Sequence, residues 1–178
     1  MPKTILYIAM SEDGFIAGDK DNLDFLNPYQ VEGEDYGYGS FMETIGAILV
    51  GRRTYEKVLS MGYPYHEDRQ VYVITRQNRP SSGKLHFCGG DLRELIEGLK
   101  QSTGRNVYCD GGAGLAQSML QQGLIDEIML SIIPVLLQRG TLLFAGGVVP
   151  DGFECKSTNT FATGLIQYVY ELKKQEDR

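Results

Sequence analysis

Three short stretches of the chain combine residue types that can hold an anion. The first is Asp110-Gly111-Gly112-Ala113-Gly114, which follows an apolar run and precedes a segment with helical spacing. Glycine lets a backbone approach a ligand closely, and the free N–H groups at a helix start favour a negative charge. A plain turn from strand to helix also favours glycine, so this run alone is typical of either a phosphate site or a turn.

The other two stretches add arginine and threonine. Gly51-Arg52-Arg53-Thr54 follows the apolar run Ala47–Val50, and Thr75-Arg76-Gln77-Asn78-Arg79 lies where the apolar run Val71–Thr75 ends. Guanidinium groups match the geometry of phosphate, and a threonine hydroxyl can donate to a phosphate or cap a helix. Taken singly, each stretch is more typical of surface arginines beside a helix cap. Three of them in one sheet indicate a ligand with several phosphates.

Apolar runs and helical spacing predict the elements that must position these stretches. The predicted strands are Thr4–Met10, Ala47–Val50, Val71–Thr75, Leu85–Cys88, Asn106–Cys109, Ile125–Pro134, Phe153–Phe161 and Leu165–Leu172. The predicted helices are Asp35–Ile45, Thr54–Ser60, Leu92–Gln101 with Asp91 as its N-cap, and Leu115–Gln122. The polar segment Ser11–Asp24 is expected to be an ordered loop.

This order of elements predicts an α/β fold in a single domain that spans residues 1–178. Strands that alternate with helices imply a mixed, mostly parallel central sheet with helices on both faces. The last two strands, joined through Ala162-Thr163-Gly164, should form a C-terminal antiparallel hairpin. Ligands of such sheets bind beyond the carboxyl ends of the strands, which is where the three anion-friendly stretches lie.

Composition excludes several classes of protein. The net charge of −6 argues against general nucleic-acid binding, and no apolar run is long enough to span a membrane. The cysteines Cys88, Cys109 and Cys155 form no CxxC pair, so neither a disulfide framework nor a metal site is expected. The first residues lead directly into a strand and lack the form of a secretory signal, which favours a cytoplasmic location.

Three segments together resemble the dihydrofolate reductase-like superfamily: IAMSEDGFIAG, ILVGRRTYEKV and VYCDGGAGLAQSMLQQGLIDEIMLSIIPVLLQRGTLLF. They are most similar to the branch that contains the reductase domain of the bifunctional riboflavin-biosynthesis deaminase/reductase and its stand-alone relatives. The resemblance runs from about Thr4 to Leu172, and the order GRRTYE, GGAG, GLIDE is specific where any one motif would not be. A Rossmann fingerprint does not explain the glycine run, which comes too late in the chain.

The resemblance implies NADPH-dependent hydride transfer to a conjugated C=N bond of a pterin- or pyrimidine-type substrate. Ala9 and Ile16 would flank the nicotinamide ring, and Thr75 and Arg76 would lie along the adenosine half. The residues that would meet the pyrophosphate and the other phosphates are Gly51, Arg52, Arg53, Thr54, Gly111, Gly112, Ala113, Gly114, Leu115 and Ala116.

The catalytic acid implied by the resemblance is Asp35. Its spacing before Arg52 is similar to that of the substrate-binding carboxylate of dihydrofolate reductases, and a carboxylate there could hold an amidine-like edge. The alternative is a carboxylate that only stabilises a helix start. His66 and His86 are expected to be loop and core residues, and Asp126-Glu127 to be structural.

Several alternatives remain open at this point. The nearest named activity is 5-amino-6-(5-phosphoribosylamino)uracil reductase of riboflavin biosynthesis. Dihydrofolate reductase proper is the nearest rival, and the lack of tryptophan counts against it. Two further alternatives are not enzymes. One is a nucleotide-binding protein without catalytic activity, and the other is an interaction protein whose glycine runs are only turns. The resemblance also implies a homodimer.

Overall fold

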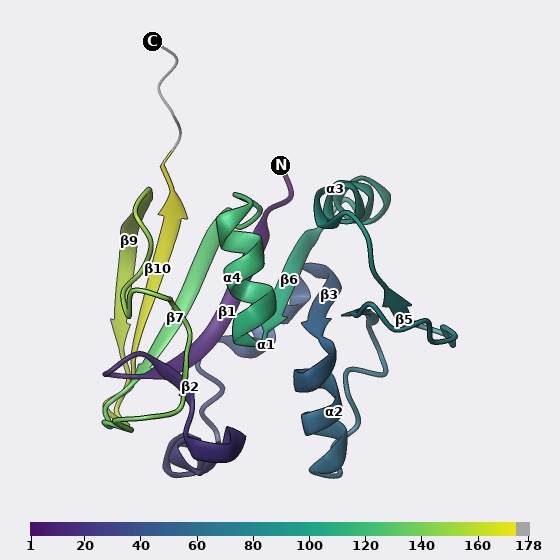
Figure 1. The fold of residues 1–178 in the computed structure, drawn as a ribbon. Helices are drawn as coiled ribbons and strands as arrows, with labels where there is room; N and C mark the ends of the chain where they lie inside the picture. The colour runs from purple at the N-terminus through teal and green to yellow at the C-terminus, as the bar shows by residue number, and fades with distance from the viewer. Residues whose placement is uncertain (174–178) are drawn as a thin grey trace.

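The computed structural model describes residues 1–173, and eight of its strands form one sheet (Figure 1). Their order across the sheet is β5-β4-β3-β6-β1-β7-β10-β9. The bounds are β1 Thr4–Ser11, β3 Ile45–Gly51, β4 Gln70–Ile74, β5 Leu85–Cys88, β6 Asn106–Gly111, β7 Glu127–Ile133, β9 Phe153–Thr160 and β10 Ile166–Leu172. The predicted strands are confirmed, with ends that move by one to a few residues.

Strand direction follows the predicted pattern. The strands from β5 to β7 pair in parallel, whereas β10 is antiparallel to both β7 and β9. The central strand β3 is apolar and almost completely buried, as expected for a strand that is covered on both faces. The mixed, mostly parallel sheet with its C-terminal antiparallel pair is therefore confirmed.

Helices cover both faces of this sheet (Figure 1). One face packs against α1 (Tyr38–Glu43) and α2 (Arg52–Ser60) through buried side chains such as Phe41 and Tyr55. The other face packs against α3 (Leu92–Thr103) and α4 (Ala113–Gln121) through Ile96 and Met119. Asp91 caps α3 as predicted, because its side chain accepts hydrogen bonds from the N–H groups of Arg93 and Glu94.

Two local predictions were wrong. The helix expected over Asp35–Ile45 is confined to Tyr38–Glu43, because Gly37 takes a left-handed conformation with φ +80° immediately before it. The loop expected over Ser11–Asp24 contains β2 (Phe15–Ala17), which pairs with β8 (Thr141–Leu142), and two short 3-10 helices, Asp19–Asp21 and Asp24–Tyr29. A pairing between segments so far apart leaves no local periodicity to detect.

Within residues 1–173, every helix is too short or too polar to cross a lipid bilayer.

Candidate active site

Two helices begin side by side at the carboxyl edge of the sheet. Strand β3 passes directly into α2 at Gly51, and its neighbour β6 passes into α4 at Gly112. A Cβ built on Gly51 would lie only 3.5 Å from the carbonyl oxygen of Gly111, so the two turns are in close contact. Neither N-cap provides a side-chain hydrogen bond. The first N–H groups of both helices are thus available to one anionic group.

The closest point between these turns is Gly112. A Cβ added there would meet the hydroxyl oxygen of Thr54 at 2.7 Å, which is too short for any real contact. Thr54 does not cap its own helix, although that was one interpretation of its sequence position. Its hydroxyl instead faces the second glycine turn. This geometry fits a narrow phosphate cradle, because glycine at position 112 lets the two helix starts approach each other closely.

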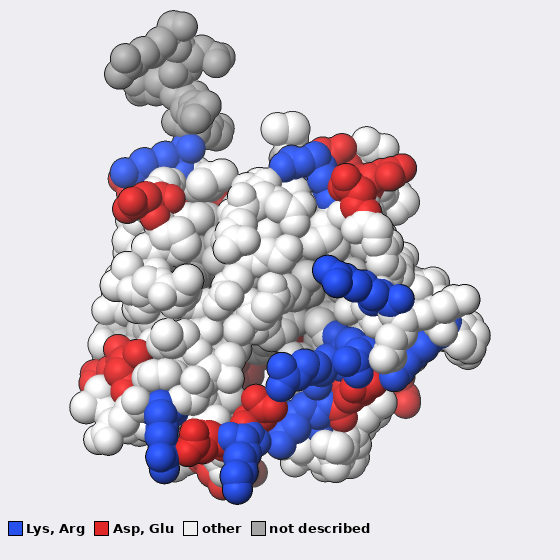
Figure 2. Space-filling view, viewed as in Figure 1, with Lys and Arg blue, Asp and Glu red and all other residues white. Residues whose placement is uncertain are grey.

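An arginine pair lies beside this cradle. Glu56 on α2 accepts a hydrogen bond from Arg52 at 2.8 Å through one carboxylate oxygen and from Arg79 at 2.7 Å through the other. Both bonds hold the pKa of Glu56 below its usual value, Arg79 having the larger effect. Figure 2 shows basic side chains gathered over α2 and the adjoining loop after β4. Arg79 lies in one of the three anion-friendly stretches but was not among the residues expected to contact the cofactor. The structure places its guanidinium on the same carboxylate as that of Arg52.

The other residues expected at the phosphates and adenosine differ in their exposure. Arg53 is strongly exposed, and its guanidinium lies 3.5 Å from the Asp21 carboxylate. Arg76 is also exposed, and its side chain makes no ion pair or hydrogen bond with any residue in the range 1–173. Thr75 is buried, and its hydroxyl accepts a hydrogen bond from the N–H of Gln77. The threonine therefore shapes the turn that presents Arg76.

The residues at the start of α4 differ in how they could meet a phosphate. Ala113 and Gly114 are at the surface in the first turn of the helix, where N–H groups have no partner within the helix. Leu115 is buried by its side chain and can offer only its backbone. Ala116 is completely buried, and its N–H already donates to the Gly112 carbonyl oxygen at 3.0 Å. The Ala116 N–H is therefore engaged within the helix, and the cofactor-binding role expected of Ala116 stays a prediction.

The residues expected beside the nicotinamide lie at the carboxyl end of β1. Ala9 pairs with Ser131 of β7, and Ile16 lies in β2 and packs against the core. Next to Ser131, the buried Gln167 of β10 donates to the Ser131 hydroxyl at 3.3 Å and to the Tyr7 hydroxyl at 3.0 Å. Its amide also reaches the Tyr36 carbonyl at 3.3 Å. This polar group holds the segment before α1 against the sheet.

Asp35 has the contacts of a helix cap. Its two carboxylate oxygens accept from the N–H groups of Gly39 at 3.0 Å and Gly37 at 2.9 Å. These bonds, with Gly39 first, lower the pKa of Asp35, whereas a proton donor needs a pKa that is raised. The geometry favours the alternative of a carboxylate that stabilises a helix start. Whether Asp35 also contacts a substrate stays a prediction.

A second acid, Asp110, lies at the end of β6 immediately before the glycine turn. Its carboxylate accepts hydrogen bonds from the Tyr65 hydroxyl and, at 2.5 Å, from the Tyr108 hydroxyl. The Tyr65 and Tyr108 rings are buried, and Asp110 keeps partial exposure. Tyr38 packs edge-on against Tyr108, and its hydroxyl lies 3.4 Å from Nε2 of His66. We call Asp110 with Tyr38, Tyr65 and Tyr108 the tyrosine cluster.

Burial raises the pKa of Asp110, and the hydroxyls of Tyr108 and Tyr65 oppose this shift. A carboxyl group with a raised pKa can hold a proton for delivery to a substrate. Sequence patterns did not point to Asp110, because an aspartate before a glycine turn has no distinctive pattern. Tyr65, which encloses it, comes from a distant loop.

The raised pKa predicts how stability depends on pH. Both states are protonated in strong acid, and the unfolded chain loses the Asp110 proton first, near pH 4. The free energy of unfolding, relative to that of Asp110→Asn, should therefore fall as pH rises above about 4 and level off above the raised pKa. Urea unfolding of both proteins at several pH values measures this difference. A difference that grows with pH would contradict the assignment.

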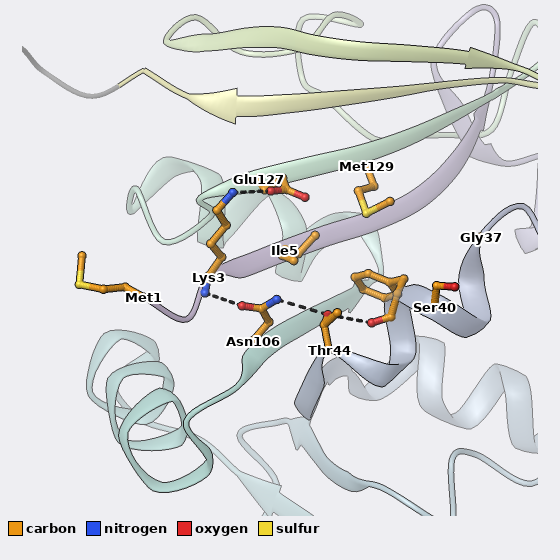
Figure 3. Close-up of a pocket in the computed structure, with 10 residues that line it drawn as sticks. Met1, Lys3, Ile5, Gly37, Ser40, Thr44, Asn106, Glu127 and Met129 are labelled. Atoms are coloured by element: carbon orange, nitrogen blue, oxygen red, sulfur yellow. Dashed lines mark hydrogen bonds and ion pairs between the residues drawn. The ribbon is translucent and has the colours of Figure 1, made fainter.

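The opposite edge of the sheet contains a pocket of about 520 Å³ (Figure 3). Ile5, Phe41 and Met129 form its apolar part, and these residues lie on β1, α1 and β7. Because it opens at the amino ends of the strands, this pocket is separate from the glycine turns.

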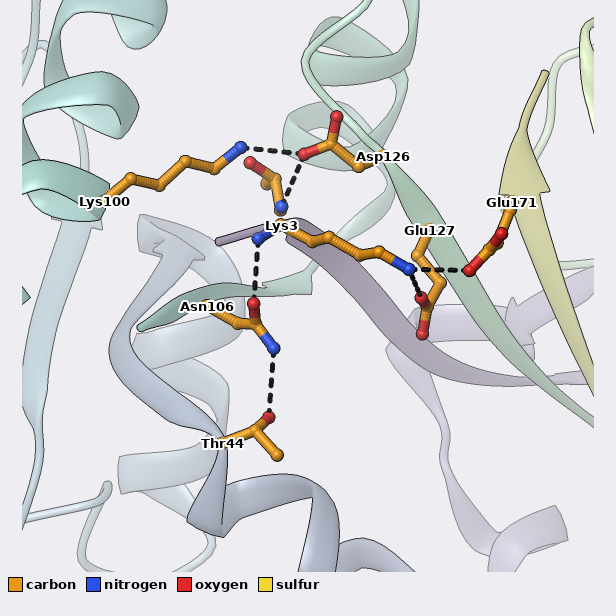
Figure 4. A network of polar contacts seen from close by, with 8 residues as sticks. Lys3, Thr44, Lys100, Asn106, Asp126, Glu127 and Glu171 are labelled. Carbon is orange, nitrogen blue, oxygen red and sulfur yellow. Dashed lines mark hydrogen bonds and ion pairs between the residues drawn. The ribbon is translucent and has the colours of Figure 1, made fainter. Parts of the chain in front are cut away.

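The polar contacts around this pocket join the ends of several strands (Figure 4). The Lys3 ammonium pairs with Glu127 at 2.7 Å and with Glu171 at 2.6 Å. Asp126 accepts from the N–H of Thr4 and from the Lys100 ammonium. The predicted structural role of Asp126-Glu127 is confirmed, because both residues tie neighbouring elements together.

Comparison with known proteins agrees with the fold. The chain is 39% identical over 173 residues to the uncharacterized protein YwjB of Bacillus subtilis (strain 168). This match covers 94% of the chain and 97% of YwjB. A solved structure from Shewanella sp. PV-4, described as a riboflavin biosynthesis protein, is 28% identical, covers 97% of this chain and 99% of its own, and has a TM-score of 0.86.

Dihydrofolate reductase from Enterococcus faecalis, solved in complex with NADP(H), shares the fold at a TM-score of 0.66 and 16% identity, with 97% of each chain covered. The family model of the RibD C-terminal domain matches residues 2–167. The chain therefore belongs to the RibD C-terminal domain family and has the dihydrofolate reductase-like fold.

Proposed function

We propose that the protein is an NADPH-dependent reductase that transfers hydride to a conjugated C=N bond of a pterin- or pyrimidine-type heterocycle. The reaction class is that of 5-amino-6-(5-phosphoribosylamino)uracil reductase. The observation that carries the proposal is the meeting of two uncapped helix starts at Gly51 and Gly112, beside the pair Arg52 and Arg79. Membership in a family named after a riboflavin-biosynthesis protein supports the same reaction class.

The residues at this edge fit a dinucleotide with an additional phosphate. The N–H groups at the two helix starts suit a pyrophosphate, and glycine at position 112 lets these two starts lie close together. The guanidinium groups of Arg52 and Arg79 suit the 2′-phosphate that distinguishes NADPH from NADH. When bound, NADPH supplies the hydride, and the protein provides orientation and a proton.

Two carboxylates are candidates to bind the substrate or deliver that proton. Asp110 adjoins the glycine turn and has a raised pKa, which suits a proton donor. Asp35 is exposed and has a lowered pKa, which suits hydrogen bonding to a substrate edge. We assign proton donation to the substrate to Asp110, and we assign hydrogen bonding to the substrate to Asp35.

A calorimetric titration with NADPH and NADH in parallel tests the cofactor. We expect NADPH to bind at least about tenfold more tightly, the effect of roughly one charge-assisted contact. Equal affinities would contradict the 2′-phosphate assignment, and no binding would leave the glycine runs as turns. Tight binding without oxidation of NADPH by any pterin, dihydrofolate or aminopyrimidine would identify a nucleotide-binding protein without catalytic activity. Turnover of dihydrofolate alone would identify dihydrofolate reductase proper.

We also propose a homodimer that works in the cytoplasm. The proposal rests on the family resemblance. Light scattering that gives the mass of a single chain would refute the dimer.

A further inference from the structure

The side chain of Gln167 is buried, yet only one end of its amide is used within residues 1–173. The amide nitrogen donates to the Tyr7 hydroxyl at 3.0 Å, the Ser131 hydroxyl at 3.3 Å and the Tyr36 carbonyl oxygen at 3.3 Å. A backbone carbonyl oxygen can only accept, so the contact with Tyr36 fixes which end of the amide is the nitrogen. The other end, the carbonyl oxygen Oε1, receives no hydrogen bond from the described residues.

This unused oxygen is open to a ligand. Among side chains of residues 1–173 that are not exposed, the Thr4 hydroxyl oxygen is the one polar atom that is both fully enclosed and without a partner. Oε1 of Gln167 has no partner either, so it must keep some access to solvent, although the residue as a whole is only 7% exposed. An enclosed acceptor without a donor costs free energy, and a ligand N–H would supply the missing donor.

The Ser131 hydroxyl beside this amide has a spare hydrogen. Ser131 accepts from Gln167, and its own hydroxyl hydrogen makes no hydrogen bond within the described part of the chain. The two residues are direct cross-strand neighbours on β7 and β10, so their side chains share one face of the sheet. Together they offer one acceptor and one donor side by side. This pattern is complementary to a lactam, in which a ring N–H adjoins a ring carbonyl.

The pair lies in the row of residues where the nicotinamide is expected. Ser131 pairs with Ala9 on its other side, so Ala9, Ser131 and Gln167 form one row across three adjacent strands. Strand β1 is an inner strand, yet Tyr7 and Ala9 keep partial exposure, whereas Ile5 on the same face is buried. Solvent therefore reaches the sheet beside Ala9. Neighbouring strands are about 4.8 Å apart, so a heterocycle over Ala9 can reach the pair.

We propose that Gln167 and Ser131 bind the lactam edge of the heterocycle. The ring N–H donates to Oε1 of Gln167, and the adjacent ring carbonyl accepts from the Ser131 hydroxyl. The inference rests on the proposed reductase function and adds the residues that select the substrate. A ring without an N–H would leave the Gln167 acceptor unpaired in the complex, which discriminates against that ring. The nicotinamide carboxamide has similar chemistry, so cofactor titrations must separate the two sources.

Two pairs of rings test this inference, and the members of each pair differ only in methyl groups on the ring nitrogens. The pairs are lumazine with 1,3-dimethyllumazine, and 6-aminouracil with 6-amino-1,3-dimethyluracil. Each ring is titrated by calorimetry into protein saturated with NADP⁺ and into cofactor-free protein. We expect at least one parent ring to bind at least about tenfold more tightly than its dimethyl form. Failure of NADP⁺ to bind would refute the reductase proposal separately, because the cofactor-free titrations still compare the rings.

Two variants separate the acceptor from the donor. Gln167→Met removes the acceptor, so the preference for the parent ring should fall to within about threefold. Ser131→Ala removes the donor to the ring carbonyl, which both members of a pair possess. It should weaken both by a similar factor of about three to ten and leave the preference unchanged. Gln101→Met, at an exposed position of α3, is the matched control and should behave like the unmodified protein.

Cooperative urea unfolding shows that each variant is folded, and Ser131→Ala keeps the test decisive if Gln167→Met does not fold. Equal binding of parent and dimethyl rings in both pairs, or binding of no ring, would overturn the proposal. So would an unchanged preference in Gln167→Met or unweakened binding in Ser131→Ala. A loss of NADP⁺ affinity in these variants with unchanged ring binding would assign the pair to the nicotinamide carboxamide and overturn the substrate role.

Discussion

Replacing Arg52 with alanine is expected to weaken NADPH binding by about 10- to 100-fold and to leave NADH binding within about threefold. The reason is the arrangement around Glu56, whose two oxygens hold the guanidinium groups of Arg52 and Arg79 at 2.8 and 2.7 Å. A charge-assisted hydrogen bond to phosphate contributes about 1.5–3 kcal/mol to binding. NADH has no 2′-phosphate, so its complex does not contain this bond and its affinity should not change. Calorimetric titration of both dinucleotides measures the two affinities.

Arg79→Ala should likewise weaken NADPH binding and leave NADH binding nearly unchanged, because Arg79 shares the Glu56 carboxylate with Arg52. Arg93→Ala is the matched control, since Arg93 lies on α3 and donates to the carbonyl of Gln122. It should bind both dinucleotides normally. Equal losses of NADPH and NADH affinity in the Arg52 variant would refute the assignment of Arg52 to the 2′-phosphate.

Gly112→Ala is expected to lower the free energy of unfolding by about 1–3 kcal/mol, the usual cost of forcing an additional methyl group into a packed site. The new Cβ would lie 2.7 Å from the Thr54 hydroxyl oxygen, so either the Thr54 side chain must rotate away or the starts of α2 and α4 must separate. Separation would also disrupt the proposed phosphate cradle and weaken NADPH binding. Urea unfolding and dinucleotide titration measure the two effects.

Two variants make this prediction sharper. Gly114→Ala is the matched control, because a Cβ at Gly114 meets nothing within 4 Å, and alanine there should be neutral or stabilise the helix by up to about 1 kcal/mol. Thr54→Ala removes the opposing hydroxyl, so the double variant Thr54→Ala/Gly112→Ala should recover most of the lost stability. If Gly112→Ala proves as stable as Gly114→Ala, the close contact between the helix starts does not constrain the site.

Sequence patterns were sufficient for the central sheet and for the edge that carries the glycine and arginine turns. Runs such as Ala47–Val50 are apolar because both faces of β3 are covered, and that requirement appears directly in the residue types. The glycine and arginine turns follow these runs without a gap. Their placement at the carboxyl edge follows from strand direction alone, because parallel strands end at the same edge.

The tertiary structure alone decided the groups that come from distant segments. Tyr65 reaches Asp110 from the loop after α2, Arg79 reaches Glu56 from the loop after β4, and β2 pairs with β8. Each contact depends on how the chain closes in space, and neither partner carries a local signature of it. Asp35 also shows that a local pattern does not determine the contacts of a side chain. Its spacing indicates a substrate acid, whereas in the structure the left-handed Gly37 makes α1 begin only at Tyr38, and the Asp35 carboxylate bonds to the N–H groups of Gly37 and Gly39. Local patterns determine what a segment can form, whereas the chemistry of a side chain depends on the neighbours that only folding brings to it.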